Sequence, residues 1–228
     1  MDHSEKRKKE TEEQKNKRKE LVIAAALDVF IEKGIEKTKM TDIAEKAEVG
    51  IASVYRYFKT KTDIVMEAGI SYWSKEIDIF YSPFMENDYK VLNGLARVSK
   101  LLDVFIDIYM NHKNFYKFIE EFDNYVVKEN IPSDRLFFYE KNILNLMPIM
   151  LETLELGKND GSIKQNINNE QFYMTITHTL ISLSQKLILR NIILDSDNNF
   201  EGKAQLELVK SMALKYIENN TSGGMQNE

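Results

Sequence analysis

Apolar residues recur every three or four positions along most of this chain, which is the spacing of one face of an α-helix. The segment RKELVIAAALDVFIEK (18–33) contains one such stripe, made up of Leu21, Ala24, Ala25, Leu27 and Val29 and extended by Ile31. No segment shows the strict alternation of a strand. The pattern predicts an all-α chain of nine helices, at about 18–33, 38–47, 51–58, 60–80, 88–111, 114–128, 132–157, 168–193 and 200–219.

Helix starts and stops are marked by a few residues. Gly34 stands where a helix usually ends, and Thr38 is expected to cap the second helix. Thr60 and Asp63 have the spacing of a capping box, and Pro83 predicts a break after the fourth helix. We expect a small head over residues 18–66 and a larger body over 67–219, with mobile tails at 1–17 and 220–228.

The composition excludes several classes of protein. An apolar fraction of 43% in 228 residues is enough for a sizeable core. The absence of Cys excludes disulfides, thiolate metal sites and cysteine nucleophiles. The polar start MDHSEKRKKE has no apolar signal core, and no apolar run approaches the roughly 18 residues that cross a bilayer. We therefore expect a cytoplasmic protein without a membrane partner.

Charge is distributed unevenly along the chain. Residues 1–61 contain 15 Lys and Arg against 12 Asp and Glu, a net +3, whereas the remainder contains 16 against 24, a net −8. A cationic head on an acidic body is the arrangement expected if only the head approaches phosphate.

Residues 40–64, MTDIAEKAEVGIASVYRYFKTKTDI, have the pattern of a helix-turn-helix motif. Two short helices flank the turn Glu48-Val49-Gly50. Small Ala44 and Ala47 allow the helices to cross closely, and Val49 is expected to fill the corner.

Packing of the apolar positions leaves short or hydrogen-bonding groups on the outer side of the third helix. These are Ala52, Ser53, Arg56 and the hydroxyls of Tyr55 and Tyr57, whose rings are expected to wedge against the core above Phe58. A helix that enters a major groove needs small residues near base edges and donors near phosphates. Lys61 opens the next helix, where free N–H groups already favour an anion.

At these residues the chain resembles the tetracycline-repressor (TetR) family of bacterial transcription regulators. The resemblance covers roughly residues 18–66 and rests on IAEKA, VYRYF and the following Lys. It implies that Tyr55, Tyr57 and Lys61 hold phosphates and that Ile51, Ala52 and Ser53 face bases. It also places Thr38 and Thr41 near the DNA backbone.

The turn departs from the family's pattern, because Glu48 stands where Gly is usual and Gly50 where Ser is usual. A Glu at positive φ would cost about 1 kcal/mol, while Gly50 remains an acceptable helix cap. Alternative interpretations are that the two tyrosines are ordinary core residues and that Lys61 is a solvated helix-end lysine. The segment 6–20, with eight Lys and Arg among glutamates, is interpreted either as a phosphate-binding arm or, preferably, as a solvated extension of the first helix.

Aromatic residues are dense in the first half of the body, and fully buried they would overfill a simple bundle unless some line a cavity. They suggest a small apolar or aromatic effector, although aromatics at helical spacing are more often core. The candidate effector-binding residues are Trp73, Phe105, Tyr109, Phe118, Phe122, Phe138 and His178. His178 has a second interpretation, as a core or interface residue. No metal-ligand spacing, cofactor motif or nucleophile–base pair is evident, so no enzyme activity and no cofactor are expected.

The last two helices are apolar on more than one face, an excess that terminal helix pairs typically bury against another subunit. The candidate dimer residues are Ile176, Leu180, Leu183, Leu187, Leu206, Val209 and Leu214. A two-fold homodimer would present two recognition helices to a palindromic operator in double-stranded DNA.

Together these features predict a homodimeric regulator, most simply a repressor released by its effector. The alternative is a DNA-bound adaptor whose body binds a protein partner instead of a small ligand.

Overall fold

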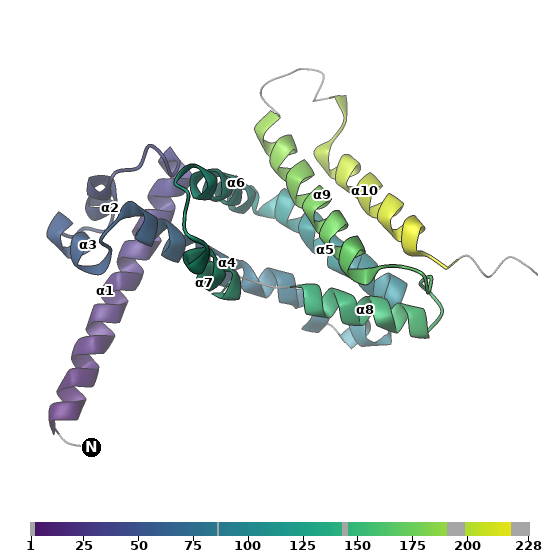
Figure 1. Ribbon diagram of the computed structural model, residues 1–228, viewed down its shortest axis with the longest axis horizontal. Helices are drawn as coiled ribbons and strands as arrows, with labels where there is room; N and C mark the ends of the chain where they lie inside the picture. The colour runs from purple at the N-terminus through teal and green to yellow at the C-terminus, as the bar shows by residue number, and fades with distance from the viewer. Residues whose placement is uncertain (1–2, 86, 143–145, 191–198, 220–228) are drawn as a thin grey trace, which may run out of the picture. The chain divides into compact units, whose positions relative to one another are not determined.

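The computed structural model describes residues 3–85, 87–142, 146–190 and 199–219. In these ranges it contains ten α-helices and one 3-10 helix, and the β-type pairing found there is an isolated bridge between Ile163 and Glu218. The predicted all-α fold with an N-terminal helix-turn-helix is confirmed (Figure 1). No helix in the described part of the chain is long and apolar enough to cross a membrane.

The chain forms two compact units. Unit 1 comprises Met1–Lys75 and Phe118–Ile143, and unit 2 comprises Glu76–Lys117 and Leu144–Glu228. The boundaries fall inside α4 (Lys61–Met85) and α6 (Lys113–Lys128), so each of these helices contributes residues to both units. The predicted head thus shares a unit with residues 118–142, and a functional division at residue 66 stays a prediction.

Unit 1 is built around the helix-turn-helix. Besides its parts of α4 and α6, it contains α1 (His3–Lys33), α2 (Met40–Lys46), α3 (Ile51–Tyr57) and α7 (Ser133–Asn142). Phe30, Ile43, Phe58 and Ile64 are at most 2% exposed. They come from α1, α2, the end of α3 and α4, and each such burial stabilises the fold by about 1.5–3 kcal/mol.

Helix α1 differs from its prediction in two respects. The helix begins at His3, where the sequence predicted a mobile tail up to residue 17. The segment contains no Gly or Pro, and charged residues such as Glu12 and Lys15, 3.3 Å apart, support a helix. The predicted apolar stripe was also wrong in part, because Leu21 is 62% exposed while Val22 and Phe30 are buried.

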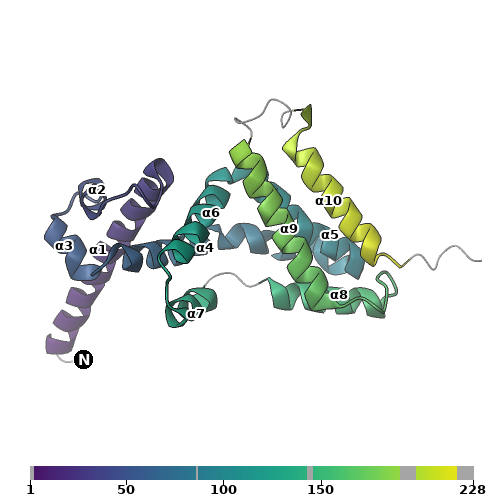
Figure 2. The same cartoon turned by 45° about the horizontal axis from the view of Figure 1, so that its top comes forward.

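Unit 2 is a helical bundle that also includes its parts of α4 and α6. Its own elements are the 3-10 helix η1 (Asn87–Val91), α5 (Gly94–Asn111), α8 (Met147–Asn159), α9 (Asn169–Arg190) and α10 (Gly202–Ile217). Helices α9 and α10 lie side by side in both views (Figure 2). The core contains Leu101, Leu102, Leu154, Leu180 and Leu206, each fully buried.

Two predicted helices are divided. The segment 88–111 begins as η1, and α5 starts only at Gly94, because the side chain of Asn93 caps it by accepting from the N–H of Ala96 at 2.9 Å. The segment 132–157 forms α7 and α8, and Pro148 lies in the first turn of α8, a position that favours a helix start. The predicted helix end at 191–193 and the tail 220–228 lie outside the described residues.

The break predicted at Pro83 does not occur, because α4 continues to Met85. Pro83 has no N–H to donate to the carbonyl of Ile79, one turn earlier. The hydroxyl of Ser82 donates to that carbonyl instead, at 3.0 Å. This bond replaces the missing backbone donor, and the helix extends for a further half turn.

Helices α5 and α8 of unit 2 approach each other through glycine. A Cβ atom on Gly94 would lie 2.2 Å from the backbone of Gly157, which is closer than real atoms approach. The N–H of Gly94 donates to the carboxylate of Asp160 at 2.7 Å, which fixes the end of α8 against the start of α5. Gly94 is therefore required by the close contact between backbones, whereas a Cβ on Gly157 would lie 2.3 Å from the side chain of Ile163.

We expect Gly94→Ala to lower the free energy of unfolding by about 1–3 kcal/mol, the usual cost of overpacking a tight contact. The measurement is urea denaturation followed by circular dichroism. Gly50→Ala is the control, because no atom lies within 4 Å of a Cβ at that position and only the smaller N-cap preference for glycine over alanine is lost. Equal losses in the two variants would contradict the backbone-contact explanation.

Candidate nucleic-acid interface

The turn of the helix-turn-helix is a left-handed corner. Glu48 has φ 53°, the conformation that the usual Gly adopts easily, so its backbone carries the expected cost of about 1 kcal/mol. The N–H of Val49 donates to the carbonyl of Ala44 at 3.0 Å and closes the turn. Gly50 then forms the N-cap of α3, also as predicted.

Burial of one side of α3 determines which residues face outward. Val54 is fully buried and packs the helix onto the head. The opposite side is exposed, with Ile51 37% and Tyr55 51% accessible beside exposed Ala52 and Arg56. Ser53 is half-buried at the edge of this surface. A short exposed helix with small Ala52 and Ser53 near its start and polar groups on Tyr55 and Arg56 can enter a major groove.

The two tyrosines of α3 have different environments. The prediction that both rings wedge against the core is wrong for Tyr55, which is more than half exposed. Tyr57 is half-buried, and its hydroxyl accepts from the guanidinium of Arg56 at 3.3 Å. That guanidinium also lies 5.2 Å from the centre of the Tyr57 ring. Phe58 closes the core at 2% exposure, as predicted.

Thr38 does not have the predicted role as a helix cap. The N-cap of α2 is Lys39, and the Thr38 side chain is 2% exposed with its hydroxyl donating to the carbonyl of Gly34 at 2.7 Å. Its hydroxyl is therefore occupied inside the head. Thr41 is exposed on the first turn of α2.

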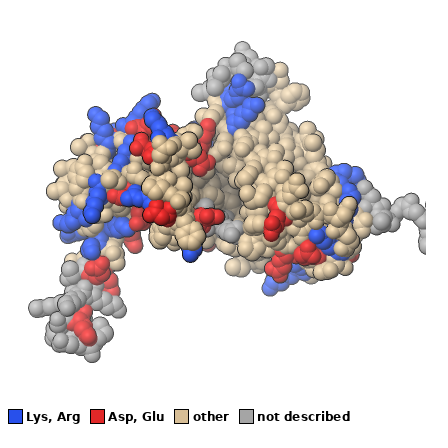
Figure 3. All heavy atoms as spheres, in the orientation of Figure 1, with Lys and Arg blue, Asp and Glu red and all other residues tan. Residues whose placement is uncertain are grey.

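Two lysines that the sequence analysis did not single out lie exposed before α2. Lys37 and Lys39 form no ion pair among the described residues, whereas Lys33 and Lys46 pair with Asp42 and Glu32. The sequence signal for these two lysines is the segment EKTKMTD (36–42), which places them directly before the predicted second helix. Figure 3 shows Lys and Arg side chains gathered on the visible face of unit 1.

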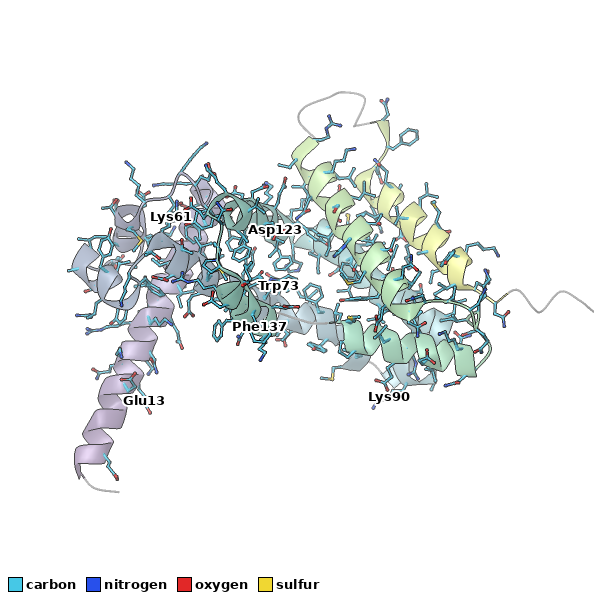
Figure 4. The ribbon with its side chains drawn as sticks, in the orientation of Figure 1. Glu13, Lys61, Trp73, Lys90, Asp123 and Phe137 are labelled. Atoms are coloured by element: carbon cyan, nitrogen blue, oxygen red, sulfur yellow. The ribbon has the colours of Figure 1, made fainter. Side chains whose placement is uncertain are left out.

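Lys61 lies at the start of α4, inside a set of contacts that the sequence did not indicate (Figure 4). Its ammonium donates to the carbonyl of Glu36 at 2.9 Å and lies 5.7 Å from the ring centre of Tyr125 on α6. Loss of solvation lowers the pKa of Lys61, opposed by the charges of Glu129 and Glu36. The lysine is thus held in a defined position at the helix start.

The predicted capping box at the start of α4 is confirmed. The N–H of Thr60 donates to the carboxylate of Asp63 at 2.8 Å, and the N–H of Asp63 donates to the Thr60 hydroxyl at 3.2 Å. These bonds and the ion pair with Arg135 at 2.9 Å lower the pKa of Asp63, although desolvation opposes them.

One face of α6 holds the corner between α1 and α2. The carboxylate of Glu121 accepts from the N–H of Ile35 at 2.6 Å, directly after Gly34 ends α1 at φ +84°. The positive φ favours glycine at this position, and a Cβ there would lie 3.0 Å from the flexible carboxylate, which would have to shift slightly. One and two turns further along α6, Tyr125 meets the hydroxyl of Thr62 at 3.1 Å, and Lys128 pairs with Glu36 at 2.5 Å.

The candidate effector residues belong to both units. Trp73, Phe118, Phe122 and Phe138 are in unit 1, and Phe105, Tyr109 and His178 are in unit 2. Phe105, Phe118 and Phe122 are 1–5% exposed and pack against other rings, Phe122 stacking on Tyr139 at 4.5 Å. Phe138 and His178 are exposed. That these residues line one cavity stays a prediction.

Polar atoms lie beside the stacked rings of Phe122 and Tyr139 in unit 1. The indole N–H of Trp73 donates to the hydroxyl of Tyr139 at 2.7 Å (Figure 4). Loss of solvation and the charge of Glu120 raise the pKa of Asp123 to about 6, and the Asp123 charge in turn contributes to raising the pKa of Tyr139. Among the described residues no group of His, Asp and Glu is arranged to hold a metal ion.

The candidate dimer residues do not share one environment. Ile176, Leu180 and Leu206 are 0–7% exposed inside the protomer, so these predicted contacts are already used by the core. Leu183, Leu187, Val209 and Leu214 are half-buried. The large exposed apolar side chains on α9 and α10 are others, namely Met174, Leu189, Leu208, Met212 and Tyr216.

The fold and the exposed face of α3 define a helix-turn-helix transcription regulator. Residues 22–68 match the family described as bacterial regulatory proteins, tetR family. It is 31% identical over 86 residues to the HTH-type transcriptional regulator LuxR of Vibrio harveyi, a match that covers 38% of this chain and only 42% of that protein. An HTH-type transcriptional regulator of Staphylococcus aureus strain MRSA252 is 26% identical over 73% of this chain and 87% of its own.

The fold extends beyond the matched segment. The transcriptional regulator FadR of Bacillus subtilis, solved in complex with stearoyl-CoA, superposes with a TM-score of 0.59 at 18% identity. The superposition covers 85% of this chain and 96% of that one. At this identity the likeness concerns the fold alone.

We expect Glu121→Ala to lower the free energy of unfolding by about 1–3 kcal/mol, because the N–H of fully buried Ile35 loses its acceptor. Lys128→Ala removes only an exposed ion pair and should cost less than about 1 kcal/mol. Urea denaturation of both variants makes the comparison. A Glu121→Ala protein as stable as the Lys128→Ala protein would show that the corner does not depend on this carboxylate.

Proposed function

We propose that this regulator is a homodimeric repressor that binds a palindromic operator and is released by a small apolar or aromatic effector. The observation that carries the proposal is the exposed face of α3, opposite buried Val54, within the segment that matches the tetR family. A repressor needs such a face at the surface of a fixed support.

The proposed contacts follow from exposure and chemistry. Ile51, Ala52 and Ser53 at the start of α3 face base edges, and exposed Ile51 can contact a thymine methyl. Tyr55 and Arg56 reach phosphates from the same helix. Thr41, with Lys37 and Lys39, extends the phosphate contacts to the start of α2.

Lys61 and Tyr57 belong to the same proposed phosphate surface. The ammonium of Lys61 has one donor used by the carbonyl of Glu36, so two N–H groups remain for a phosphate oxygen. The free N–H groups at the start of α4 add to the attraction.

A dimer surface is supported by α9 and α10. Leu208, Met212 and Tyr216 are each more than 60% exposed and recur every four residues on one side of α10. Between this side and α9 lies a groove of about 400 Å³ whose lining includes Phe172, Ile176 and Met212. A second copy related by a two-fold axis would cover these apolar side chains.

The effector acts in this proposal by shifting a population. An apolar ligand bound to the body stabilises a spacing of the two heads that no longer fits successive major grooves. The stearoyl-CoA complex of the Bacillus subtilis FadR, which shares the fold, supports an acyl or similarly apolar compound. Operator affinity measured with and without stearoyl-CoA tests this step, and unchanged affinity with bound ligand would oppose it.

We expect Lys61→Ala to weaken binding to all duplexes alike and to reduce the slope of log K against log salt by about one. Fluorescence anisotropy over a range of salt concentrations measures both quantities. Lys75→Ala is the control, since this exposed lysine lies on the same helix about 21 Å further along.

The base-facing assignment predicts a different result for Ser53. Ser53→Ala should alter which sequence is selected from a random duplex library while leaving the salt slope unchanged. A Lys61 variant that changed base preference at constant slope would contradict the phosphate assignment.

We expect Met212→Glu to convert the dimer to a monomer, because an exposed apolar side chain at the proposed interface becomes a buried charge. Sedimentation velocity measures the change. Met110→Glu, at a 46% exposed position of α5, should leave the assembly unchanged. Equal behaviour of the two variants would place the interface elsewhere.

A further inference from the structure

A hollow of about 470 Å³ opens in the surface of unit 1, beside the end of the recognition helix. Every residue that lines it belongs to unit 1, on α1, the end of α3, α4 and α7. None of the exposed residues of α3 at positions 51, 52, 55 and 56 takes part. The volume is in the range of sites for small organic molecules.

The floor and one wall of the hollow are apolar. Phe58 and Met66 are 2% and 7% exposed and form a rigid base that the head's own core supports. Half-buried Tyr57 and Ile70 continue this surface. Phe138 on α7 presents a ring that is 58% exposed, so a flat molecule could cover it at no cost to the fold.

Among the charged residues that line the hollow, one carboxylate has no ion-pair partner in the described part of the chain. Lys19 pairs with Glu67 at 2.7 Å, and Arg135 pairs with Asp63 at 2.9 Å. Asp134 also lines the hollow, is exposed, and forms no hydrogen bond or ion pair among the described residues. Each cation is already neutralised by its partner, and the net charge of the lining is −1.

We propose that this hollow binds a small organic monocation with a flat apolar body. The cationic group lies near Asp134, and the apolar body lies on Ile70, Met66 and the ring of Phe138. A flat ring system can stack on the exposed ring of Phe138, and a carboxylate without a partner supplies the opposite charge at the rim. An anion would be repelled by Asp134 and would find no unpaired positive side chain in the hollow, because Lys19 and Arg135 already form ion pairs.

The site is separate from the proposed DNA-contacting face but touches it at one residue. Tyr57 lines the hollow, and its hydroxyl accepts from the guanidinium of Arg56. A molecule bound in the hollow would therefore lie next to Tyr57, which belongs to the proposed phosphate surface. The inference rests on the cavity and its charges and does not require that the DNA-binding proposal be correct.

The probe is 1-naphthylmethylamine, a two-ring amine that is protonated at pH 7, titrated into the full-length protein by isothermal calorimetry. Its neutral and anionic counterparts are 1-naphthalenemethanol and 1-naphthoate, which have the same ring system. We expect the amine to bind more tightly than the alcohol by about fivefold, and the carboxylate to bind least.

Two pairs of variants locate the binding. Phe138→Ala should weaken binding of the amine about fivefold, whereas Phe137→Ala should not change it. Phe137 (Figure 4) is the adjacent residue on α7 and is 57% exposed, but it does not line the hollow. Asp134→Asn should weaken binding about threefold and reduce the preference for amine over alcohol, and Glu140→Gln on the same helix should do neither.

Three results would overturn the inference. They are no heat of binding up to millimolar amine, naphthoate binding as tightly as the amine, and equal effects of the Phe137 and Phe138 variants. All these side chains are exposed, so the variants are expected to fold, and circular dichroism checks this. Operator binding measured on the same proteins is a separate readout, so failure of the cation site leaves the DNA-binding proposal unaffected.

Discussion

The burial of Val54 and Phe58 is the constraint on which the recognition surface depends. Helix α3 has seven residues, which is too short for a helix to persist in water without tertiary support. Val54 is fully buried and Phe58 is 2% exposed, and together they attach the helix to the core of the head. Because the helix is attached on that side, Ile51, Ala52 and Tyr55 must face outward.

The same support explains why the strained corner at Glu48 is tolerated. Its left-handed backbone costs about 1 kcal/mol, less than the burial of a single large apolar side chain stabilises. On the other side of the head, Glu121 and Tyr125 of α6 hold the end of α1 and the start of α4. Unit 1 is therefore larger than a three-helix head, and its compactness depends on residues far apart in the chain.

Much of the fold was evident from the chain because helices are local. The period of apolar residues predicted the all-α class, and the turn of the motif, the cap at Gly50 and the capping box of Thr60 and Asp63 are confirmed. Each of these depends on residues within a few positions of one another. The errors arose where a local signal had two readings, as at Pro83, whose missing donor Ser82 replaces.

The assignment of side chains to inner and outer surfaces required the tertiary structure. Periodicity gave Ile176, Leu180 and Leu206 as interface residues, but they are core, because a helix with two apolar faces does not indicate which face the protomer itself covers. Thr38 was misjudged for the same reason, since its hydroxyl bonds inside the head. Likewise, nothing local predicts that Lys19, Tyr57 and Arg135 line one hollow.

The amino-acid sequence alone thus determined the class of fold, the helix-turn-helix and the resemblance of this segment to the tetR family, because all three are encoded in short-range spacing. Only the tertiary structure decided which tyrosine is exposed, what holds Lys61, and where cavities and free apolar faces lie. Those features depend on contacts between residues tens of positions apart, and their geometry follows from how the helices pack.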